Sequence, residues 1–422
     1  MQRLNANIFF LCKWTILLLI VGGLSGTLSA LFLTLLNLAT NFREDHSWLL
    51  YLLPLAGLFI GWLYHDMGKG IEGGNNLIFD AIHNPKDIIP FKMTPMVLAG
   101  TVLTHLFGGS AGREGTALQM SAAAADQFHK PFKLSPKERT TLLIVGLSAG
   151  FASVFGTPLA GAVFGIEVLL ISGIPFVAVI PALIGAYLAS YVTALWGVGH
   201  THYHIDLIPS MTLGGAGYSI VAGIFFSAAA IIFVRFTHQI STFSKKISYP
   251  PFRPLIGGVV VICLALAFDT NRYLGLGIPI IVDAFQHQAL PQDFILKIIF
   301  TGITLGAGFK GGEVTPLFFI GATLGSALSF ILPLPVGLMA GMGFVAVFGA
   351  AAKTPLACII MAMELFGISC GAYVAIACVV SFLFSGSLSI YNIAENKTPK
   401  HLIFGKFSLT PLFLYFRAIL RK

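Results

Sequence analysis

Two glycine-rich breaks in this sequence combine a carboxylate with a hydroxyl donor, and both stand between apolar segments. The first is Gly108-Gly-Ser-Ala-Gly-Arg-Glu-Gly-Thr116, and the second is Gly306-Ala-Gly-Phe-Lys-Gly-Gly-Glu-Val-Thr-Pro316. Glycine lets the backbone approach a ligand closely, and the helix expected after each break directs free N–H groups and its positive dipole end back toward it. Both breaks therefore have the composition of an anion site.

The carboxylates of these breaks, Glu114 and Glu313, give the expected chemistry. A carboxylate within an apolar segment is costly and usually has a function. An ionised Glu114 can occupy the anion site and a protonated Glu114 can leave it, which couples a proton to an anion. Two structural alternatives stand beside this interpretation: Glu114 only complements the helix dipole, and Glu313 forms an ion pair with Lys310.

Another glycine-rich segment and one tyrosine offer further donors. The segment Gly73-Gly-Asn-Asn-Leu77 carries two side-chain amides, although Gly-Asn clusters are also typical of plain turns. Tyr391 follows the last apolar segment, where its phenol can donate to an anion or simply lie at the membrane interface. The predicted anion-binding set is Gly74, Asn75, Asn76, Arg113, Gly115, Thr116, Val314, Thr315 and Tyr391.

The composition predicts that membrane-spanning helices position these residues. Of 422 residues, 56% are hydrophobic and only 10% are charged, and the mean hydropathy is +0.87. Soluble domains carry about 25% charged residues. The net charge of +8 is spread over the ends of apolar segments, as in cytoplasmic loops and tails, and does not form a nucleic-acid patch. We expect an all-α polytopic membrane protein.

The apolar segments fall into a long and a short class. The long ones lie at 14–42, 48–64, 94–107, 140–155, 174–196, 213–236, 255–268, 294–307, 334–350 and 369–390, and the short ones at 115–128, 157–171, 276–286, 314–331 and 355–367. A bilayer needs about 20 apolar residues for one helix, so the short segments predict helices that end within the membrane. Five scattered cysteines are expected to be small core residues.

An internal repeat relates the two halves. Thr157-Pro-Leu-Ala leads to Glu167, Thr354-Pro-Leu-Ala leads to Glu364, and one of the two breaks precedes each segment. Broken helices at corresponding places of two halves indicate a transport site at the bilayer midplane. We interpret Glu167 and Glu364 themselves as structural residues near helix ends. The predicted divisions are a first half of the transport domain at 1–210, a second half at 211–395 and a basic tail at 396–422.

In this order the motifs resemble those of the CLC family of chloride channels and proton-coupled antiporters. The resemblance rests on Gly112-Arg-Glu-Gly115, the break before Thr315, the segment ending at Glu167 and Tyr391, and it covers about residues 8–395. It implies two inverted repeats of tilted and broken helices, one anion path per subunit and a homodimer. It also implies that Glu114 is the gating glutamate and Tyr391 the central tyrosine.

Departures from the chloride-type motifs resemble the fluoride-exporting branch of that family. Thr116 replaces the usual proline, Gly74-Asn75-Asn76 replaces a Ser-Gly-Ile-Pro-type motif, and Gly-Glu-Val-Thr-Pro at 312–316 replaces Gly-x-Phe-x-Pro. Val168 stands where proton-coupled chloride members often carry a second glutamate. Glu313 is therefore the candidate for the remaining proton step.

The resemblance implies a secondary active transporter that exports fluoride in exchange for protons and gives fluoride resistance. Fluoride enters cells as its neutral acid and is trapped when ionised, so its export needs an energy source such as inward proton movement. A chloride/proton antiporter and a passive anion channel on the same fold remain alternatives. An intramembrane enzyme or ion sensor is a third, although the sequence has no HExxH or GxSxG motif.

The expected partners are fluoride, protons, the lipid bilayer and a second copy of the chain, with no nucleic acid, no cofactor and no enzymatic activity. The expected location is the inner (plasma) membrane, crossed many times. The alternating residues His200, His202, His204 and Asp206 could hold a metal, but we interpret this segment as a polar connection between the halves.

Overall fold

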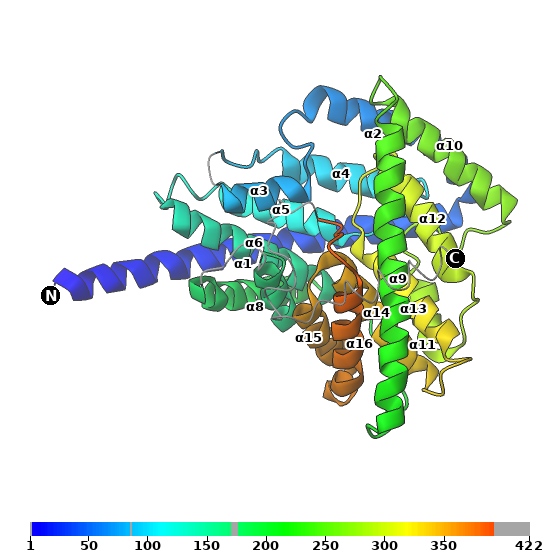
Figure 1. Ribbon diagram of the computed structural model, residues 1–422. Coiled ribbons are helices and arrows are strands. Elements are labelled where there is room, and N and C mark those ends of the chain that lie inside the picture. The colour runs from blue at the N-terminus through cyan, green and yellow to red at the C-terminus, as the bar shows by residue number, and fades with distance from the viewer. Residues whose placement is uncertain (1, 85–86, 170–175, 392–422) are drawn as a thin grey trace, which may run out of the picture.

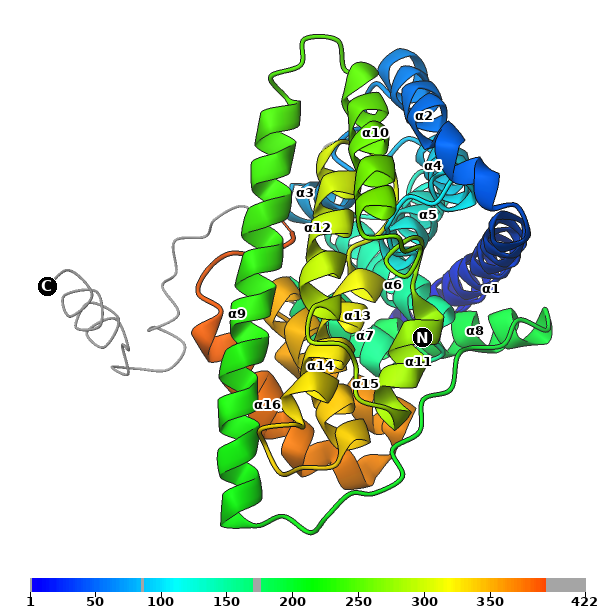
Figure 2. The ribbon, with the colours of Figure 1, turned by 90° about the vertical axis from the view of Figure 1, so that its right-hand side faces the viewer.

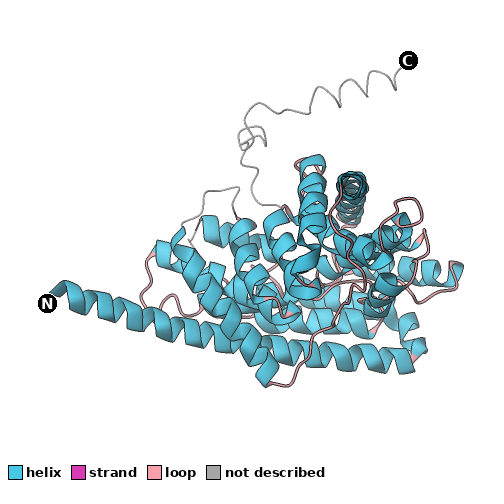
Figure 3. Ribbon diagram, turned by 90° about the horizontal axis from the view of Figure 1, so that it is seen from below, coloured by secondary structure: helices cyan, strands magenta, loops and turns pink. Residues whose placement is uncertain are grey.

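The computed structural model describes residues 2–84, 87–169 and 176–391. Apart from one isolated bridge, all regular structure in these ranges is helical (Figure 3). The first helices are α1 (Gln2–Asp45), α2 (Leu53–Met67), α3 (Asn75–His83), α4 (Met93–Leu106), α5 (Glu114–Asp126), α6 (Pro136–Phe155), α7 (Pro158–Glu167) and α8 (Val179–Leu195). The following ones are α9 (Leu213–Ser244), α10 (Phe252–Ala267), α11 (Ile278–Gln286), α12 (Asp293–Gly306), α13 (Val314–Leu328), α14 (Val336–Ala352), α15 (Pro355–Phe366) and α16 (Gly371–Phe384).

Local sequence sets several helix ends in both halves. Pro158 and Pro355 stand in the first turns of α7 and α15, where a missing N–H costs nothing. Ser135 and Glu138 form a capping box at the start of α6, and Gly156 ends α6 in the left-handed conformation. Gly156 and Pro158 together set the turn from α6 into α7.

The two series of helices match in order and length, as the repeat predicts. The helices α3 and α11 have nine residues each, and α4 and α12 have fourteen each. Long and short helices follow one another in the same order in both series, which agrees with the predicted all-α membrane fold of two repeats.

Two carboxylates show that the repeats are inverted. Glu167, at the end of α7, accepts hydrogen bonds of 2.9 and 2.7 Å from the N–H groups of Leu356 and Ala357 in the first turn of α15. In return Glu364, near the end of α15, accepts bonds of 2.9 and 2.8 Å from the first turn of α7. Each helix therefore starts where the other ends, and both glutamates are structural, as predicted.

The helices differ in how far they can reach across a membrane. Within the described residues, four stretches are long and apolar enough to span it: 8–45, 47–67, 136–155 and 213–244. The helix α9 runs along the full height of the molecule, beside α12, α14 and α16 (Figures 1 and 2). The helices α5, α13 and α14 are buried along almost their whole length, so the starts of α5 and α13 lie inside the protein.

The structure corrects two details of the sequence analysis. Helix α3 lies where only a turn or a donor segment was expected at Asn75, because a nine-residue helix with a polar face gives little apolar signal. Cys12 and Cys263 are exposed and are not core residues, whereas the other three cysteines are buried. The predicted tail at 396–422 lies outside the described residues, and so do residues 170–175, where the predicted segments 157–171 and 174–196 come together.

Candidate anion site between the two breaks

The two glycine-rich breaks lie against each other. Gly112 and Gly312 form an antiparallel bridge in which each N–H donates to the other's carbonyl at 2.7 Å. No side chain fits there, because a Cβ on Gly312 would lie 2.8 Å from the backbone nitrogen of Gly115. The bridge therefore brings the starts of α5 and α13 together, although about half of the chain separates them in sequence.

The carboxylate of Glu114 fills the space between these helix starts. One of its oxygens, Oε2, accepts hydrogen bonds of 3.1 Å from the backbone N–H groups of Arg113 and Thr315. The other oxygen, Oε1, accepts a hydrogen bond from the Thr315 hydroxyl. Glu114 is fully buried, and its carboxylate occupies the place at the N-terminus of the other half's helix where an anion would bind. It does more than complement the dipole of its own helix.

Glu313 and Lys310 do not form the ion pair that the sequence left open. The ammonium of Lys310 lies over the ring of Tyr64, 3.9 Å from its centroid. Glu313 is half-buried at the start of α13 and makes no side-chain capping bond. Within the described residues its carboxylate has no ion pair. The structural alternative for Glu313 is therefore wrong in the form in which it was stated.

The start of α3 approaches the first break from another direction. Gly74 precedes the helix with φ +55° and ψ −128°, a conformation open only to glycine. The amide nitrogen Nδ2 of Asn75 lies 3.2 Å from where a Cβ on Gly115 would stand, and Oδ1 of Asn75 is buried without a hydrogen-bond partner. Asn76 lies in the same first turn, where its N–H donates to the carbonyl of Gly73.

Tyr391 lies inside the protein and not at a membrane interface. Its side chain is 4% exposed. The ring packs edge-on against Phe79 of α3, at 5.1 Å between centroids, and against Phe164 of α7, at 6.4 Å. The interface interpretation of Tyr391 is wrong, because two helices cover its ring.

Arg113 completes the surroundings of Glu114 without a close ion pair. Its Nε lies 4.0 Å from Glu114 Oε1, too far for a hydrogen bond, and this buried nitrogen has no partner. Burial, together with the nearby Arg113 guanidinium, holds the pKa of His200 in the linker between α8 and α9 below its usual value. Arg113 thus supplies positive charge on the side of the site that the linker covers.

Two hydroxyl pairs, which the sequence did not predict, fix the first break to α4 of its own half and to α12 of the other half. Thr116 bonds to Thr101 of α4 at 2.6 Å between hydroxyls, and Ser110 bonds to Thr301 of α12 at 2.8 Å. Thr116 therefore uses its hydroxyl within the scaffold. Val314 is 1% exposed and contributes its backbone position at the start of α13.

The histidine segment of the linker does not gather as a metal site. His204 and Asp206 approach each other at 3.3 Å and are both exposed, whereas His200 contacts the carbonyl of Val154. Over the part of the chain that the structure describes, no three histidine, cysteine, aspartate or glutamate side chains form a potential metal-binding group. The segment links α8 to α9, and His202, His204 and Asp206 are exposed in it.

Comparison with known proteins finds similar sequences over most of this chain. The model of the voltage gated chloride channel family matches residues 56–386. A chloride/fluoride channel protein of Pseudomonas syringae pv. tomato is 49% identical over 93% of this chain and 88% of its own length. A proton/chloride exchange transporter of Yersinia pestis is 26% identical over 74% of this chain and 69% of its own length.

Solved structures agree with these relatives. A crystal structure of a CLC-type fluoride/proton antiporter superimposes with a TM-score of 0.88 and 34% sequence identity, covering 91% of this chain and 98% of that one. A slow cyanobacterial chloride/proton antiporter superimposes with a TM-score of 0.77 at 20% identity, covering 93% of this chain and 97% of that one. This second likeness concerns the fold alone.

Proposed function

Because the chain belongs to the voltage-gated chloride channel (CLC) family, we propose that it is a secondary active transporter that exports fluoride in exchange for protons. Two similar proteins support this choice of ion: one is named a chloride/fluoride channel protein and the other is a CLC-type fluoride/proton antiporter. Export of fluoride would give the cell resistance to it.

The observation that carries the proposal is the position of the Glu114 carboxylate. It takes two donors of Thr315, the N–H and the hydroxyl. An anion that arrives at the start of α13 must compete for these donors with the carboxylate, and protonation weakens the carboxylate as an acceptor of them. Anion entry and protonation of Glu114 therefore favour each other, which couples the binding of the anion to that of the proton.

The donors around Glu114 suit an ion as strongly hydrated as fluoride. Replacing a tightly held hydration shell requires several short, strong hydrogen bonds. Asn75, Thr315 and Tyr391, with the backbone N–H groups of the two breaks, are the donors that we assign to the site. Gly74, Asn76, Arg113, Gly115, Thr116 and Val314 complete it by shaping the backbone, the charge and the scaffold.

We assign the second proton step to Glu313. Val168 occupies the place of the usual internal glutamate, so another titratable group must receive the proton. Glu313 is partly accessible, precedes Val314 at the start of α13 and has no ion pair within the described residues. A carboxylate without a fixed partner can change its charge at little structural cost.

A passive anion channel is the second candidate, since the relative from Pseudomonas syringae is named a channel protein. In a channel, Glu114 would gate the path without obligatory proton movement. We further propose that the protein is not an enzyme, forms a homodimer and lies in the inner (plasma) membrane. We also propose that the transport domain consists of a first half at 1–210 and a second half at 211–395.

A liposome experiment separates these functions. Purified protein is sealed into liposomes loaded with fluoride, and fluoride efflux and proton uptake are recorded together, with and without a potassium shunt. We expect fluoride efflux to drive proton uptake against its gradient and chloride to give little. Rapid fluoride loss without proton movement would establish a channel, and chloride-driven proton uptake would establish a chloride/proton antiporter.

A further inference from the structure

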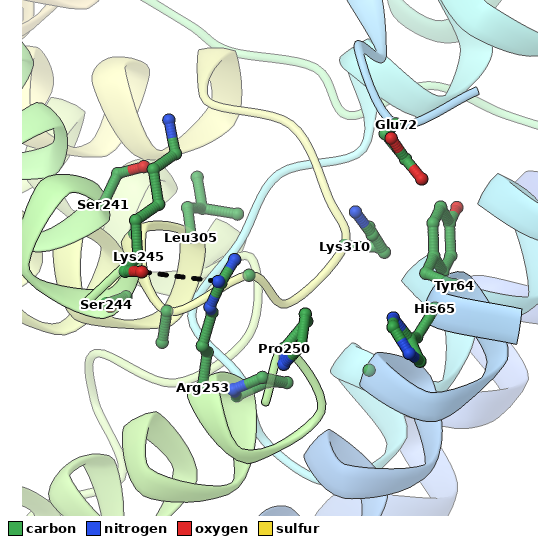
Figure 4. A pocket seen from close by; sticks show the side chains of 15 residues that line it. Tyr64, His65, Glu72, Ser241, Ser244, Lys245, Pro250, Arg253, Leu305 and Lys310 are labelled. Carbon is green, nitrogen blue, oxygen red and sulfur yellow. Dashed lines mark hydrogen bonds between the residues drawn. The ribbon is translucent and has the colours of Figure 1, made fainter. Parts of the chain in front are cut away.

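A basic cleft lies outside the anion site, where α2 and α9 end and α10 begins (Figure 4). Its volume is about 490 Å³, and its lining includes Tyr64, His65, Glu72, Lys245, Arg253 and Lys310. Because α9 spans the membrane over 32 residues and ends at Ser244, the cleft stands at the level of the lipid headgroups on the side of the basic loop.

The cations of the cleft are not neutralised by the protein. Figure 4 shows Lys245 and Arg253 on one side of the cleft and Lys310 on the other. Within the described residues none of these three side chains has an ion pair: the Arg253 guanidinium donates to the carbonyls of Ile247 and Lys245, at 3.1 and 3.4 Å. Glu72, which is exposed, is the carboxylate in the lining. The cleft therefore carries a net positive charge.

An apolar groove lies beside the cleft on the outer surface of α2 and α10. Its volume is about 430 Å³, and it is lined by Leu55, Leu58, Phe59, Trp62, Tyr249 and Phe252. The rings of His65, in the cleft, and Tyr249, in the groove, are 5.7 Å apart and join the two. Leu55 and Phe59 precede the cleft residues of α2 by one to three helical turns, so the groove runs from the cleft toward the bilayer interior.

We propose that this surface binds an anionic phospholipid. The headgroup phosphate lies in the cleft against Lys245, Arg253 and Lys310, and one acyl chain lies in the groove along Trp62 and Phe252. Basic pockets between membrane helices next to an apolar, aromatic surface have the chemistry that such a lipid needs. A free phosphate would use the cleft alone and leave the groove without a purpose.

The lipid would contact the segment that carries the second break. The side chain of Lys310 packs against α4, where a Cβ on Gly100 would lie 2.9 Å from its Cγ, so a glycine makes room for it. Lys310 stands two residues before Gly312, which pairs with Gly112. A phosphate bound to Lys310 would therefore be only three residues away in sequence from Glu313, in the same loop.

Native mass spectrometry of the full-length protein in detergent tests the proposal. Phosphatidylglycerol and phosphatidylcholine with identical dioleoyl chains are titrated in parallel, and we expect the anionic lipid to bind more tightly. Lys245→Gln should weaken phosphatidylglycerol binding about fivefold, the equivalent of about 1 kcal/mol for one cation near a phosphate. Lys246→Gln is the matched control, because the Lys246 ammonium lies over the Phe243 ring at 4.7 Å, outside the cleft lining.

The groove is tested with a second pair of variants. Trp62→Ala should weaken the binding of both lipids, whereas Trp48→Ala, at another exposed tryptophan outside the groove, should leave it unchanged. Equal binding of the two lipids, or equal loss in the Lys245 and Lys246 variants, would overturn the proposal. A third outcome would also overturn it: inorganic phosphate raises the unfolding temperature of the protein, but not of the Lys245 variant, and displaces no lipid. This result would identify the cleft as a site for a soluble anion.

Discussion

The carboxylate of Glu114 accepts hydrogen bonds from both the backbone N–H and the hydroxyl of Thr315. These residues stand at corresponding breaks of two inverted halves, 201 residues apart in sequence. One half thus supplies the titratable anion and the other supplies the donors that an incoming anion would use. Removing either side of this contact leads to a different prediction.

Glu114→Gln is expected to abolish proton coupling, because a glutamine side chain does not titrate. Proton uptake driven by fluoride should fall by about 100-fold or more, since a single proton-transfer group typically changes a rate by about 100- to 10,000-fold. The measurement is simultaneous recording of both ions in liposomes. Glu364→Gln is the control, because Glu364 also accepts hydrogen bonds from the start of a helix, α7, but lies outside the two breaks. Unchanged coupling in the Glu114 variant would remove Glu114 from the proton route.

Thr315→Val should slow fluoride/proton exchange about tenfold, because a hydrogen bond to a charged group contributes about 1.5–3 kcal/mol and valine removes the hydroxyl at nearly constant volume. Thr315→Ser keeps the donor and should retain most of the rate. Exchange rates of the two variants at equal reconstitution levels check this. Equal rates in both variants would show that the backbone N–H alone matters.

Asn75→Ser is expected to reduce the preference for fluoride over chloride about tenfold, since serine is too short to reach the first break and one charged hydrogen bond is worth about 1.5–3 kcal/mol. The preference is measured as the ratio of initial efflux rates. The same change at the other end of α3, Asn84→Ser, is the control and should leave the ratio unaltered. A ratio that stays constant in both variants would take Asn75 out of the anion site.

Glu313→Gln should slow proton uptake about tenfold, which corresponds to about 1.4 kcal/mol, while the unfolding temperature changes little. The reason is that Glu313 has no ion pair within the described residues and therefore little structural role. Proton flux and thermal unfolding are measured on the same preparation. A variant with normal coupling and a clearly lowered unfolding temperature would assign Glu313 to the scaffold.

Gly312→Ala should abolish exchange, because the new Cβ would stand 2.8 Å from the backbone nitrogen of Gly115 and would force the paired breaks apart. Gly217→Ala is the matched control: this glycine lies in α9 with no atom within 4 Å of its added Cβ, and alanine favours the helix there by about 0.5–1 kcal/mol. Transport assays and unfolding curves of both variants decide the matter. Normal exchange by Gly312→Ala would mean that the bridge is not required.

Much of the fold follows from apolar segment length and from the repeat. The segments expected from hydropathy coincide with helices wherever the structure describes them, because a membrane helix must be apolar over most of its length. Helix α3 was missed for the same reason: it is short and half polar. The repeat predicted corresponding breaks, but composition alone does not tell whether two repeats are parallel or inverted.

The site was predictable in its residue types and not in its contacts. Glycine, carboxylate and threonine marked both breaks, since an anion site needs close backbone and strong donors. The contact of Glu114 with Thr315 joins segments 201 residues apart, and no local pattern encodes such a distance. Lys310 was misleading because it is near Glu313 in sequence, whereas its stem follows the space left by Gly100. Thr116 was predicted to bind the anion, but its hydroxyl forms a hydrogen bond with the hydroxyl of Thr101.

The exchange of carboxylates between α7 and α15 also sets an order of events during synthesis. The N–H group of Leu159 donates to Glu364, which is made 205 residues later in the chain. At about 5–20 residues per second a ribosome needs roughly 10–40 s to supply it. Throughout that interval the start of α7 must be satisfied by water or by the insertion machinery. The first half therefore completes its hydrogen bonds only after the second half has been made. A nascent chain that stops before α15 would leave the N–H groups of Leu159 and Ala160 without their carboxylate.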